Sequence, residues 1–127
     1  VAPMIESNGI EMILGMTTDQ QLGPMITIGF GGYYAEALKD AVTLMPPFTA
    51  ETAKTAIKSL RMKSLLDGYR GTDPVDINAF AQMASVFSLI AIEFKEQISE
   101  IDINPVILGK DNCIAVDALI SLHQQKK

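Results

Sequence analysis

Hydrophobic and polar residues alternate along the first third of the chain, which predicts β-strands. The apolar positions of the first expected strand, over residues 9–18, are Ile10, Met12, Leu14 and Met16. This strand is therefore expected to bury one face. After a turn, a second strand is expected over 25–30 and a weaker third over 35–45, which Pro46 and Pro47 end. Short connections in this order predict an antiparallel meander.

Two later segments show the three- and four-residue spacing of amphipathic helices. Thr49 is expected to cap the first, and Asp73 the second, with Pro74 as its first residue and Asp76 at its third. The second helix carries the apolar stripe Ile77, Phe80, Ala84, Phe87, Ala91 and Phe94. We interpret this stripe as core; its alternative role is an assembly surface formed by the three phenylalanines. Strands, then helices, then strands predict an α+β fold, an antiparallel sheet backed by helices.

The most informative pattern lies near the C-terminus, where alternation over 99–104 sets Asp102 and Asn104 opposite in direction to their isoleucine neighbours. Turn residues over 109–112 separate this strand from an expected return strand over 113–118. A two- or four-residue loop pairs Leu108 with Cys113 and, counting back, Asn104 with Asp117. A loop of odd length turns Asp117 to the other face.

An even-length loop brings the side chains of Asp102, Asn104 and Asp117 together on one face. Two carboxylates and an amide carbonyl are hard-oxygen ligands suited to Mg²⁺. The ordinary explanation is a solvated acidic strand next to turn-forming residues. Spacing alone leaves both explanations open.

Three further features suggest anion or metal chemistry. Backbone N–H groups of Gly29, Gly31 and Gly32 can approach a phosphate, although a tight turn explains the same glycines. Arg70, between two glycines, suits a phosphate or carboxylate, although an isolated loop arginine is commonly surface. On a continuous strand Glu36 and Asp40 share one face. They would either hold a metal or orient a base, or they simply form a solvated surface.

Composition narrows the class of protein. The 127 residues are enough for one domain, and the 48% apolar content argues against disorder. A net charge of −5 and the lack of a basic cluster argue against a nucleic-acid partner, and no apolar run reaches the ~20 residues of a membrane helix. The single Cys113 excludes an internal disulfide and a cysteine-based zinc site, and without a signal peptide we expect a cytoplasmic protein. Because Val1 follows no initiator methionine, we expect a piece of a longer protein.

Several short motifs follow one another along the chain in an order that is typical of one protein family. They are Gly9-Ile10-Glu11-Met12-Ile13-Leu14-Gly15, Leu22-Gly23-Pro24-Met25, Gly29-Phe30-Gly31-Gly32, Leu65-Leu66-Asp67-Gly68-Tyr69-Arg70-Gly71, Glu100-Ile101-Asp102-Ile103-Asn104-Pro105 and Ala115-Val116-Asp117-Ala118. The ordered set resembles the ATP-grasp region of NDP-forming acyl-CoA synthetases of the ADP-forming acetyl-CoA synthetase type. The succinyl-CoA synthetase β subunit is a more distant relative. The resemblance implies a C-terminal half of an ATP-grasp domain over residues 1–120, followed by a polar tail over 121–127.

The resemblance also implies a reaction and a ligand set. Acyl-CoA, ADP and phosphate would be interconverted with acid, CoA and ATP through an acyl phosphate and a phosphohistidine. In the succinyl-CoA relative the residues matching Asn104 and Asp117 hold Mg²⁺, and Asp102 stands where that relative has Glu. ATP or ADP and Mg²⁺ are therefore the expected ligands.

The parts that such a synthetase needs besides this chain are the N-terminal half of the ATP-grasp domain, the CoA-binding domain and the phosphohistidine. Without them we expect no turnover and weak nucleotide binding, and a broken domain edge that favours a homodimer or aggregation. A degenerate synthetase-like sensor of a protein acetyltransferase is the alternative function.

Overall fold

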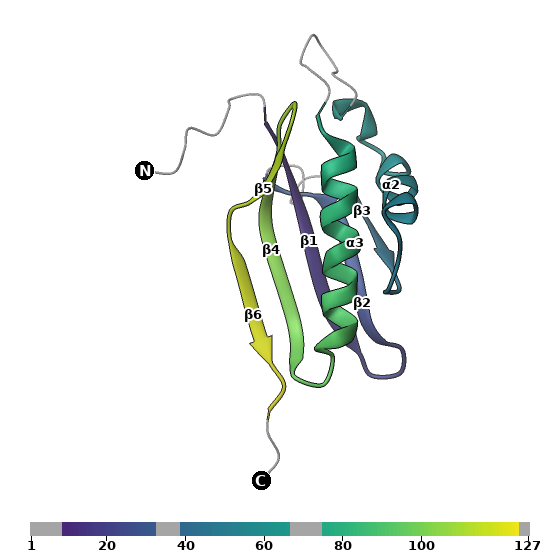
Figure 1. Ribbon diagram of the computed structural model, residues 1–127, viewed down its shortest axis with the longest axis vertical. Helices are drawn as coiled ribbons and strands as arrows, with labels where there is room; N and C mark the ends of the chain where they lie inside the picture. The colour runs from purple at the N-terminus through teal and green to yellow at the C-terminus, as the bar shows by residue number, and fades with distance from the viewer. Residues whose placement is uncertain (1–8, 33–38, 67–74, 125–127) are drawn as a thin grey trace.

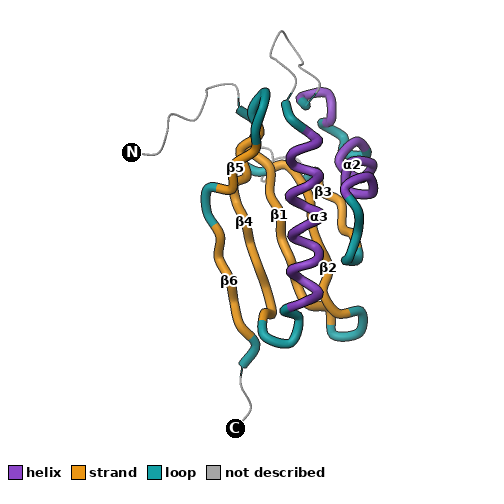
Figure 2. The backbone as a smooth tube through the Cα atoms, viewed as in Figure 1, coloured by secondary structure: helices purple, strands orange, loops and turns teal. Residues whose placement is uncertain are grey.

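The computed structural model describes residues 9–32, 39–66 and 75–124, which form an antiparallel sheet and two helices (Figures 1 and 2). The strands are β1 (Ile10–Asp19), β2 (Gly23–Phe30), β3 (Ala41–Leu44), β4 (Ile98–Leu108), β5 (Cys113–Ala115) and β6 (Ala118–Leu122). The helices are α2 (Ala50–Lys58), the short 3₁₀ turn η1 (Lys63–Leu65) and α3 (Ile77–Glu93). The order across the sheet is β3-β2-β1-β4-β5, and β6 also pairs with β4. The α+β class predicted from the sequence is confirmed.

One face of the sheet packs against the helices and forms the core. Met12, Leu14 and Met16 of β1 are fully buried, as the alternation predicts. Ile26, Ile28 and Phe30 of β2 lie in the same cluster, together with Ile101, Val106 and Leu108 of β4 and the inner faces of α2 and α3. Both helices therefore cover the same side of the sheet, and α3 runs along it in Figure 1.

The meander of β1, β2 and β3 is confirmed, but β3 is shorter than predicted. It begins at Ala41 rather than in the thirties, because Lys39 has a left-handed φ of 49° that an extended strand cannot contain. Residues 33–38 lie outside the described part of the chain. The fourth strand is inserted beside β1, so the two ends of the chain contribute neighbouring strands.

Both helices exist, and one start was wrongly predicted. Thr49 caps α2 by accepting a hydrogen bond from the Thr52 backbone N–H at 3.2 Å. Helix α3 begins at Ile77 with Asp76 as its N-cap, so the prediction of an Asp73 cap and a Pro74 start is wrong. The Asp76 side chain accepts from the Ala79 N–H at 2.9 Å, and its own N–H donates to the Gly109 carbonyl at 2.8 Å, which fixes the start of the helix. No described helix is long and apolar enough to cross a membrane.

The phenylalanine stripe of α3 divides between core and surface. Phe80 is fully buried and Phe87 is 5% exposed, so the core interpretation is confirmed for both. An assembly surface made of all three phenylalanines is therefore wrong, because two of them are occupied inside the chain. Phe94, the C-cap, is 42% exposed.

The C-terminal hairpin has the predicted turn but a divided return strand. Leu108 pairs with Cys113 across a four-residue loop. The return strand is interrupted at Val116 and Asp117, which separate β5 from β6. Strand β6 continues through Leu122, so residues 121 and 122 belong to the sheet rather than to the expected polar tail.

Candidate functional site

The second face of the sheet, which no described helix covers, carries the candidate site residues; we call it the open face. Thr43, Thr27, Gly15, Asp102 and Leu119 stand directly opposite one another along one row across five strands. Residues paired in this way lie on the same face of an antiparallel sheet. On β4 Asp102 and Asn104 are exposed while Ile101 is buried and Ile103 packs against the core, so the predicted division of β4 into two faces is confirmed.

Asn104 and Asp117 face each other across the hairpin. The register that joins Leu108 to Cys113 in β5 is the same as the register that joins Ile103 to Ala118 in β6. Between these pairs the Asn104 N–H donates to the Asp117 carbonyl at 3.2 Å. The pairing of Asn104 with Asp117 expected from the sequence is confirmed, and metal binding by their side chains stays a prediction.

A β-bulge sets the position of Asn104. The pairing of β4 with β1 shifts between Met12 and Leu14, so that Asn104 and Pro105 together oppose Ile13. The Asn104–Pro105 peptide bond within the bulge is cis. Bulges are frequent next to active sites, because they re-aim a side chain within a sheet. This one lets Asn104 lie on the open face while Val106, two positions on, returns to the core.

Gly31 leaves room for the Asn104 side chain. A Cβ atom built on Gly31 would lie 3.4 Å from Asn104 Oδ1 and 3.1 Å from Ile13 Cγ2. The contact with Ile13 is tighter than nine in ten real Cβ contacts, and the one with Asn104 is at the lower limit of ordinary van der Waals contact. The absence of a side chain at position 31 therefore allows the amide oxygen of Asn104 to reach over the end of β2, and it brings a predicted phosphate-binding glycine next to a predicted metal ligand.

Glu11 is a site neighbour that the sequence analysis did not single out. Its backbone carbonyl accepts a hydrogen bond from the Gly31 N–H at 2.8 Å. Gly32 has a φ of 58°, and a Cβ built on it would lie 3.2 Å from the Glu11 carboxylate. The left-handed backbone at position 32 favours glycine. A glutamate among the apolar residues that open β1 was the available sequence signal.

The two remaining predicted anion contacts have different outcomes. Gly29 lies within β2, and a Cβ there would stand 2.7 Å from the Ala41 Cβ and 2.9 Å from the Asp40 carbonyl oxygen. Close approach of β3 is thus a sufficient structural reason for glycine at position 29. Arg70 lies outside the described residues, so its role stays a prediction.

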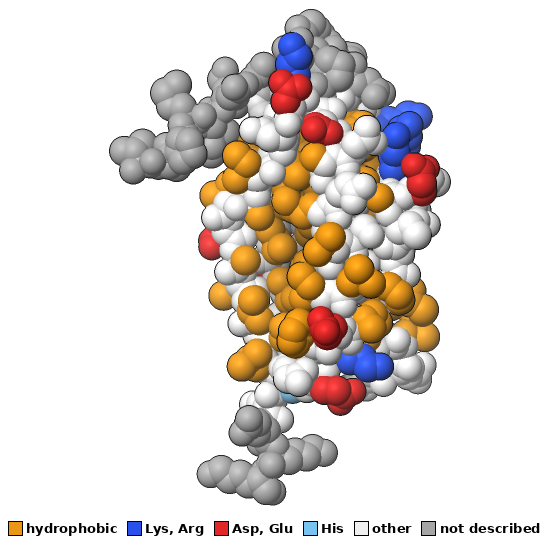
Figure 3. Space-filling view, in the orientation of Figure 1, with side chains coloured by type: hydrophobic (Ala, Val, Ile, Leu, Met, Phe, Trp, Pro, Cys, Tyr) orange, Lys and Arg blue, Asp and Glu red, His pale blue; other side chains and the backbone are white. Residues whose placement is uncertain are grey.

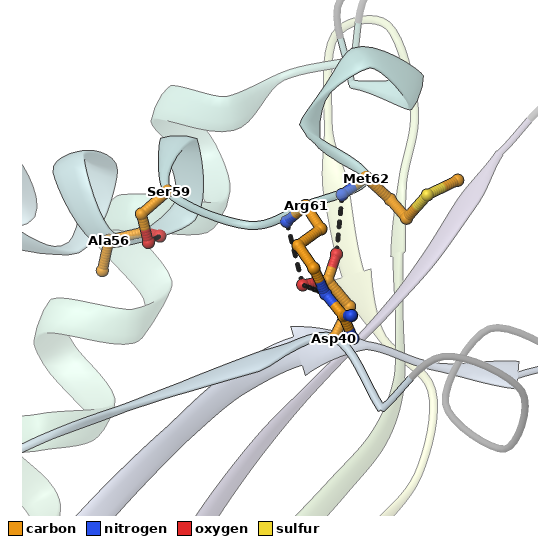
Figure 4. Close-up of polar contacts among 5 residues, drawn as sticks. All are labelled: Asp40, Ala56, Ser59, Arg61 and Met62. Atoms are coloured by element: carbon orange, nitrogen blue, oxygen red, sulfur yellow. Dashed lines mark hydrogen bonds and ion pairs between the residues drawn. The ribbon is translucent and has the colours of Figure 1, made fainter.

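Asp40 has a structural role instead of the solvated or metal-binding roles considered from the sequence. Its side chain is 4% exposed and accepts hydrogen bonds from the backbone N–H groups of Arg61 at 2.9 Å and Met62 at 2.7 Å (Figure 4). The Arg61 Nε lies 3.7 Å from the carboxylate. These contacts tie the segment after α2 to the start of β3. Glu36, its expected partner, is outside the described residues.

The charge on the strands is entirely negative. The six described strands contain no Lys, Arg or His, whereas Glu11, Asp19, Glu100 and Asp102 lie on them. Within the described ranges no three His, Cys, Asp or Glu side chains are grouped closely enough to hold a metal by themselves. A cation at Asn104 and Asp117 would therefore need oxygen atoms from a ligand to complete its coordination.

Cys113 and His123 lie away from this chemistry. Burial and the nearby Asp76 carboxylate raise the pKa of the half-buried Cys113 thiol, which disfavours the reactive thiolate. His123 follows β6. Its ring Nε2 lies 3.1 Å from the Lys95 carbonyl oxygen, and its backbone N–H donates to the Gln97 carbonyl. The contacts of Cys113 and His123 are those of residues with a structural role.

The open face can be compared with known proteins. A protein-family model described as an ATP-grasp domain matches residues 1–122. The chain belongs to the ATP-grasp domain family. ATP-grasp domains bind nucleotide.

Close ATP-grasp relatives are parts of ADP-forming synthetases. Two are β subunits of ADP-forming acetate–CoA ligases of Pyrococcus furiosus. Subunit β of ligase I is 41% identical over 114 residues, which are 90% of this chain and 49% of the relative. Subunit β of ligase II is 36% identical over 124 residues, which are 96% and 52% of the two chains. The chain thus spans about half the length of these curated relatives.

Solved structures agree. The apo form of acetyl-coenzyme A synthetase 1 of Ca. Korarchaeum cryptofilum, 36% identical, superimposes with a TM-score of 0.87 over 97% of this chain and 56% of that one. The same enzyme in complex with coenzyme A and Mg-AMPPCP gives a TM-score of 0.85 at 36% identity, over 91% of this chain and 54% of that one.

Proposed function

We propose that this chain supplies the Mg²⁺–nucleotide face of an ADP-forming acyl-CoA synthetase. The reaction would join acyl-CoA, ADP and phosphate to acid, CoA and ATP. The observation that carries the proposal is the backbone pairing of Asn104 with Asp117, beside Gly31, in a chain 41% identical to a synthetase β subunit.

The donor atoms suit Mg²⁺. Asn104 offers an amide oxygen and Asp117 a carboxylate, and neither is a soft ligand that would select zinc. One Asp117 oxygen accepts from the Ala118 N–H at 2.9 Å, and the other has no partner among the described residues. Mg²⁺ commonly takes one or two protein ligands and completes its shell with phosphate oxygens and water. Asp102 lies two residues before Asn104 on the same face of β4, and it would contact the cation through a water molecule or a second-sphere hydrogen bond.

Nucleotide phosphates need a cation at this surface. The strands present carboxylates and no basic side chain, so a bare phosphate would be repelled. When bound, Mg²⁺ supplies charge neutralisation for the phosphoryl group being transferred. The K. cryptofilum synthetase has been solved in complex with Mg-AMPPCP, which supports the same pair of ligands here.

The residues of this chain would position the nucleotide. The Gly31 N–H already donates to the Glu11 carbonyl, so Gly32 is the glycine of this turn that would offer its backbone to a phosphate oxygen. The bulge at Asn104 would hold the amide oxygen beside this turn. Glu11 packs against Gly32 and would fix the shape of that turn. Arg70 is proposed to contact a phosphate.

The remaining parts of the reaction require partners. We propose that a CoA-binding part and a phosphohistidine part, in the same chain or another subunit, complete the site. In the K. cryptofilum complex a phosphohistidine segment points towards the nucleotide-binding site. A single unpaired cysteine fits a reducing compartment, so we place the reaction in the cytoplasm.

The proposal is tested by ATP formation in the assembled synthetase from acetyl-CoA, ADP, phosphate and Mg²⁺. Asp117→Ala is expected to lower kcat/KM by ~10²-fold or more, since it removes a metal ligand. Asp111→Ala, an exposed carboxylate in the loop of the same hairpin, is the matched control and should retain activity. Equal activity of both variants would refute the metal assignment. A wild-type assembly that is inert with several acyl-CoAs but binds one of them would favour the acetyltransferase-sensor function.

A further inference from the structure

Glu11 places a carboxylate beside the turn that ends β2. Its Cδ and Oε1 lie 3.2 Å from the position that a Cβ on Gly32 would take. The Gly31 N–H donates to the Glu11 carbonyl at 2.8 Å, which holds the turn against the start of β1. Glu11 is exposed, and its carboxylate makes no hydrogen bond or ion pair with any residue that the structure describes. Its charge can therefore act on a ligand that occupies the turn.

The same turn is next to the amide oxygen of Asn104. A Cβ built on Gly31 would meet Asn104 Oδ1 at 3.4 Å. Glu11 lies two residues before Ile13 on β1 and shares its face of the sheet, and Asn104 opposes Ile13 through the bulge. An anion at the turn and a cation on Asn104 would thus both lie near the Glu11 carboxylate, at distances comparable with the Debye length of about 10 Å in 0.1 M salt.

No ion pair joins Glu11 to a described cation. The six described strands carry no Lys, Arg or His. The basic residues of α2 and η1 belong to the helical side of the molecule, where Figure 3 shows Lys and Arg side chains in blue near one end. Lys39 precedes Asp40, whose carbonyl accepts from the Phe30 N–H, but it forms no ion pair with the glutamate. A phosphate at Gly32 would therefore meet a carboxylate that no described side chain neutralises.

We propose that Glu11 makes nucleotide binding at this turn depend on a divalent cation, so that the site selects Mg²⁺-bound ADP over metal-free ADP. The inference rests on the proposed function and adds a specificity-determining residue to it. The carboxylate repels bare phosphate oxygens and attracts the cation that Asn104 and Asp117 would hold. The competing explanation is a purely structural Glu11, whose packing against Gly32 shapes the turn. The two explanations differ in what they predict for the substitution of glutamine.

Glu11→Gln removes one negative charge and keeps the size of the side chain. Metal-free ADP is the more negative ligand, so the loss of repulsion should strengthen its binding. Mg²⁺-bound ADP should bind equally well or more weakly, because the cation loses an attractive neighbour. Two unit charges about 6 Å apart in water interact by an amount that corresponds to roughly a threefold change in binding. We therefore expect the ratio of the two Kd values, metal-free over Mg²⁺-bound, to fall by at least about threefold.

Titration calorimetry on the assembled synthetase measures both affinities, with ADP in EDTA and with ADP in excess Mg²⁺. Glu100→Gln is the matched control, because it removes the same charge from an exposed residue of β4 that pairs with Thr17, at the other end of β1. Its Kd ratio should stay within about twofold of the wild-type ratio, since the charge lies farther from the turn. Glu11→Asp keeps the charge and should keep most of the preference. Added salt should reduce the difference between wild type and Glu11→Gln, because salt screens charges.

The outcomes separate the role of Glu11 from the proposed function. If Glu11→Gln changes both affinities in the same direction and by the same factor, Glu11 is structural and the inference is overturned. An unchanged ratio, or a wild type that binds metal-free ADP as tightly as Mg²⁺-bound ADP, would also overturn it. Should Asp117→Ala abolish the Mg²⁺ dependence while Glu11→Gln keeps the wild-type ratio, only the role of Glu11 is refuted. Mg²⁺-dependent binding that is unchanged by Asp117→Ala would instead contradict the metal assignment itself.

Discussion

Replacing Asp40 by asparagine is expected to destabilise the fold by about 3 kcal/mol, although the substitution changes almost no volume. The buried carboxylate accepts two backbone N–H groups, from Arg61 and Met62, at 2.9 and 2.7 Å. Hydrogen bonds to a charged group contribute roughly 1.5–3 kcal/mol each. Asparagine keeps one neutral acceptor and turns an NH₂ toward the other N–H, so one bond is lost and the other is weakened.

The ion pair with Arg61 is expected to matter little. The Arg61 side chain is 70% exposed and its Nε stands 3.7 Å from the Asp40 carboxylate, so solvent screens the attraction. Arg61→Gln should therefore cost less than about 1 kcal/mol. Urea unfolding gives both free energies, and a loss of 3 kcal/mol corresponds to a melting temperature lower by roughly 10 °C for a domain of this size. If Arg61→Gln costs as much as Asp40→Asn, the assignment of the stability to the two backbone hydrogen bonds is refuted.

Three further changes test local parts of the structure. Gly29→Ala should lower the free energy of unfolding in urea by about 1–3 kcal/mol, because the new Cβ would stand 2.7 Å from the Ala41 Cβ. The control Gly15→Ala should change it by less than about 1 kcal/mol, because its Cβ would meet nothing closer than 3.8 Å. Equal effects of the two substitutions would contradict the close approach of β3. Asp76→Ala removes the α3 cap and should cost about 1 kcal/mol, and an unchanged unfolding midpoint would show that the cap does not stabilise the helix. Burial and Asp76 raise the pKa of the Cys113 thiol, so iodoacetamide at pH 8 should alkylate the native thiol more slowly than the thiol of the urea-unfolded chain. In the native Asp76→Ala variant the alkylation should be somewhat faster than in the native wild type. A native rate at or above the unfolded rate would contradict this.

Local rules predicted the elements whose signals lie close together in the sequence. The alternation in β1, the Thr49 cap and the four-residue turn before Cys113 each depend on neighbouring residues, and all three are confirmed. The pairing of Asn104 with Asp117 followed from that turn, because register propagates along a hairpin. Even the break between β5 and β6 does not change it.

Distant contacts explain what the sequence did not reveal. Asp40 is buried because it meets backbone groups more than twenty residues later, which no periodicity signals. The α3 start moved to Ile77 because Asp76 is held by Gly109 in the hairpin loop. Glu11 reaches the site only because β2 folds back along β1 and brings Gly32 against it. The bulge opposite Ile13 likewise depends on β4 lying beside β1.

The central claim is that the open face holds a divalent cation with its nucleotide, and paramagnetic NMR tests it most directly. Mn²⁺ accepts the same oxygen ligands as Mg²⁺ and broadens nearby amide signals even when binding is weak. Titrating Mn²⁺ and ADP into the ¹⁵N-labelled chain should broaden Gly31, Asn104 and Asp117 selectively, and Asp117→Ala should abolish this while Asp111→Ala does not. Broadening centred on the helical face, or unchanged by Asp117→Ala, would contradict the claim.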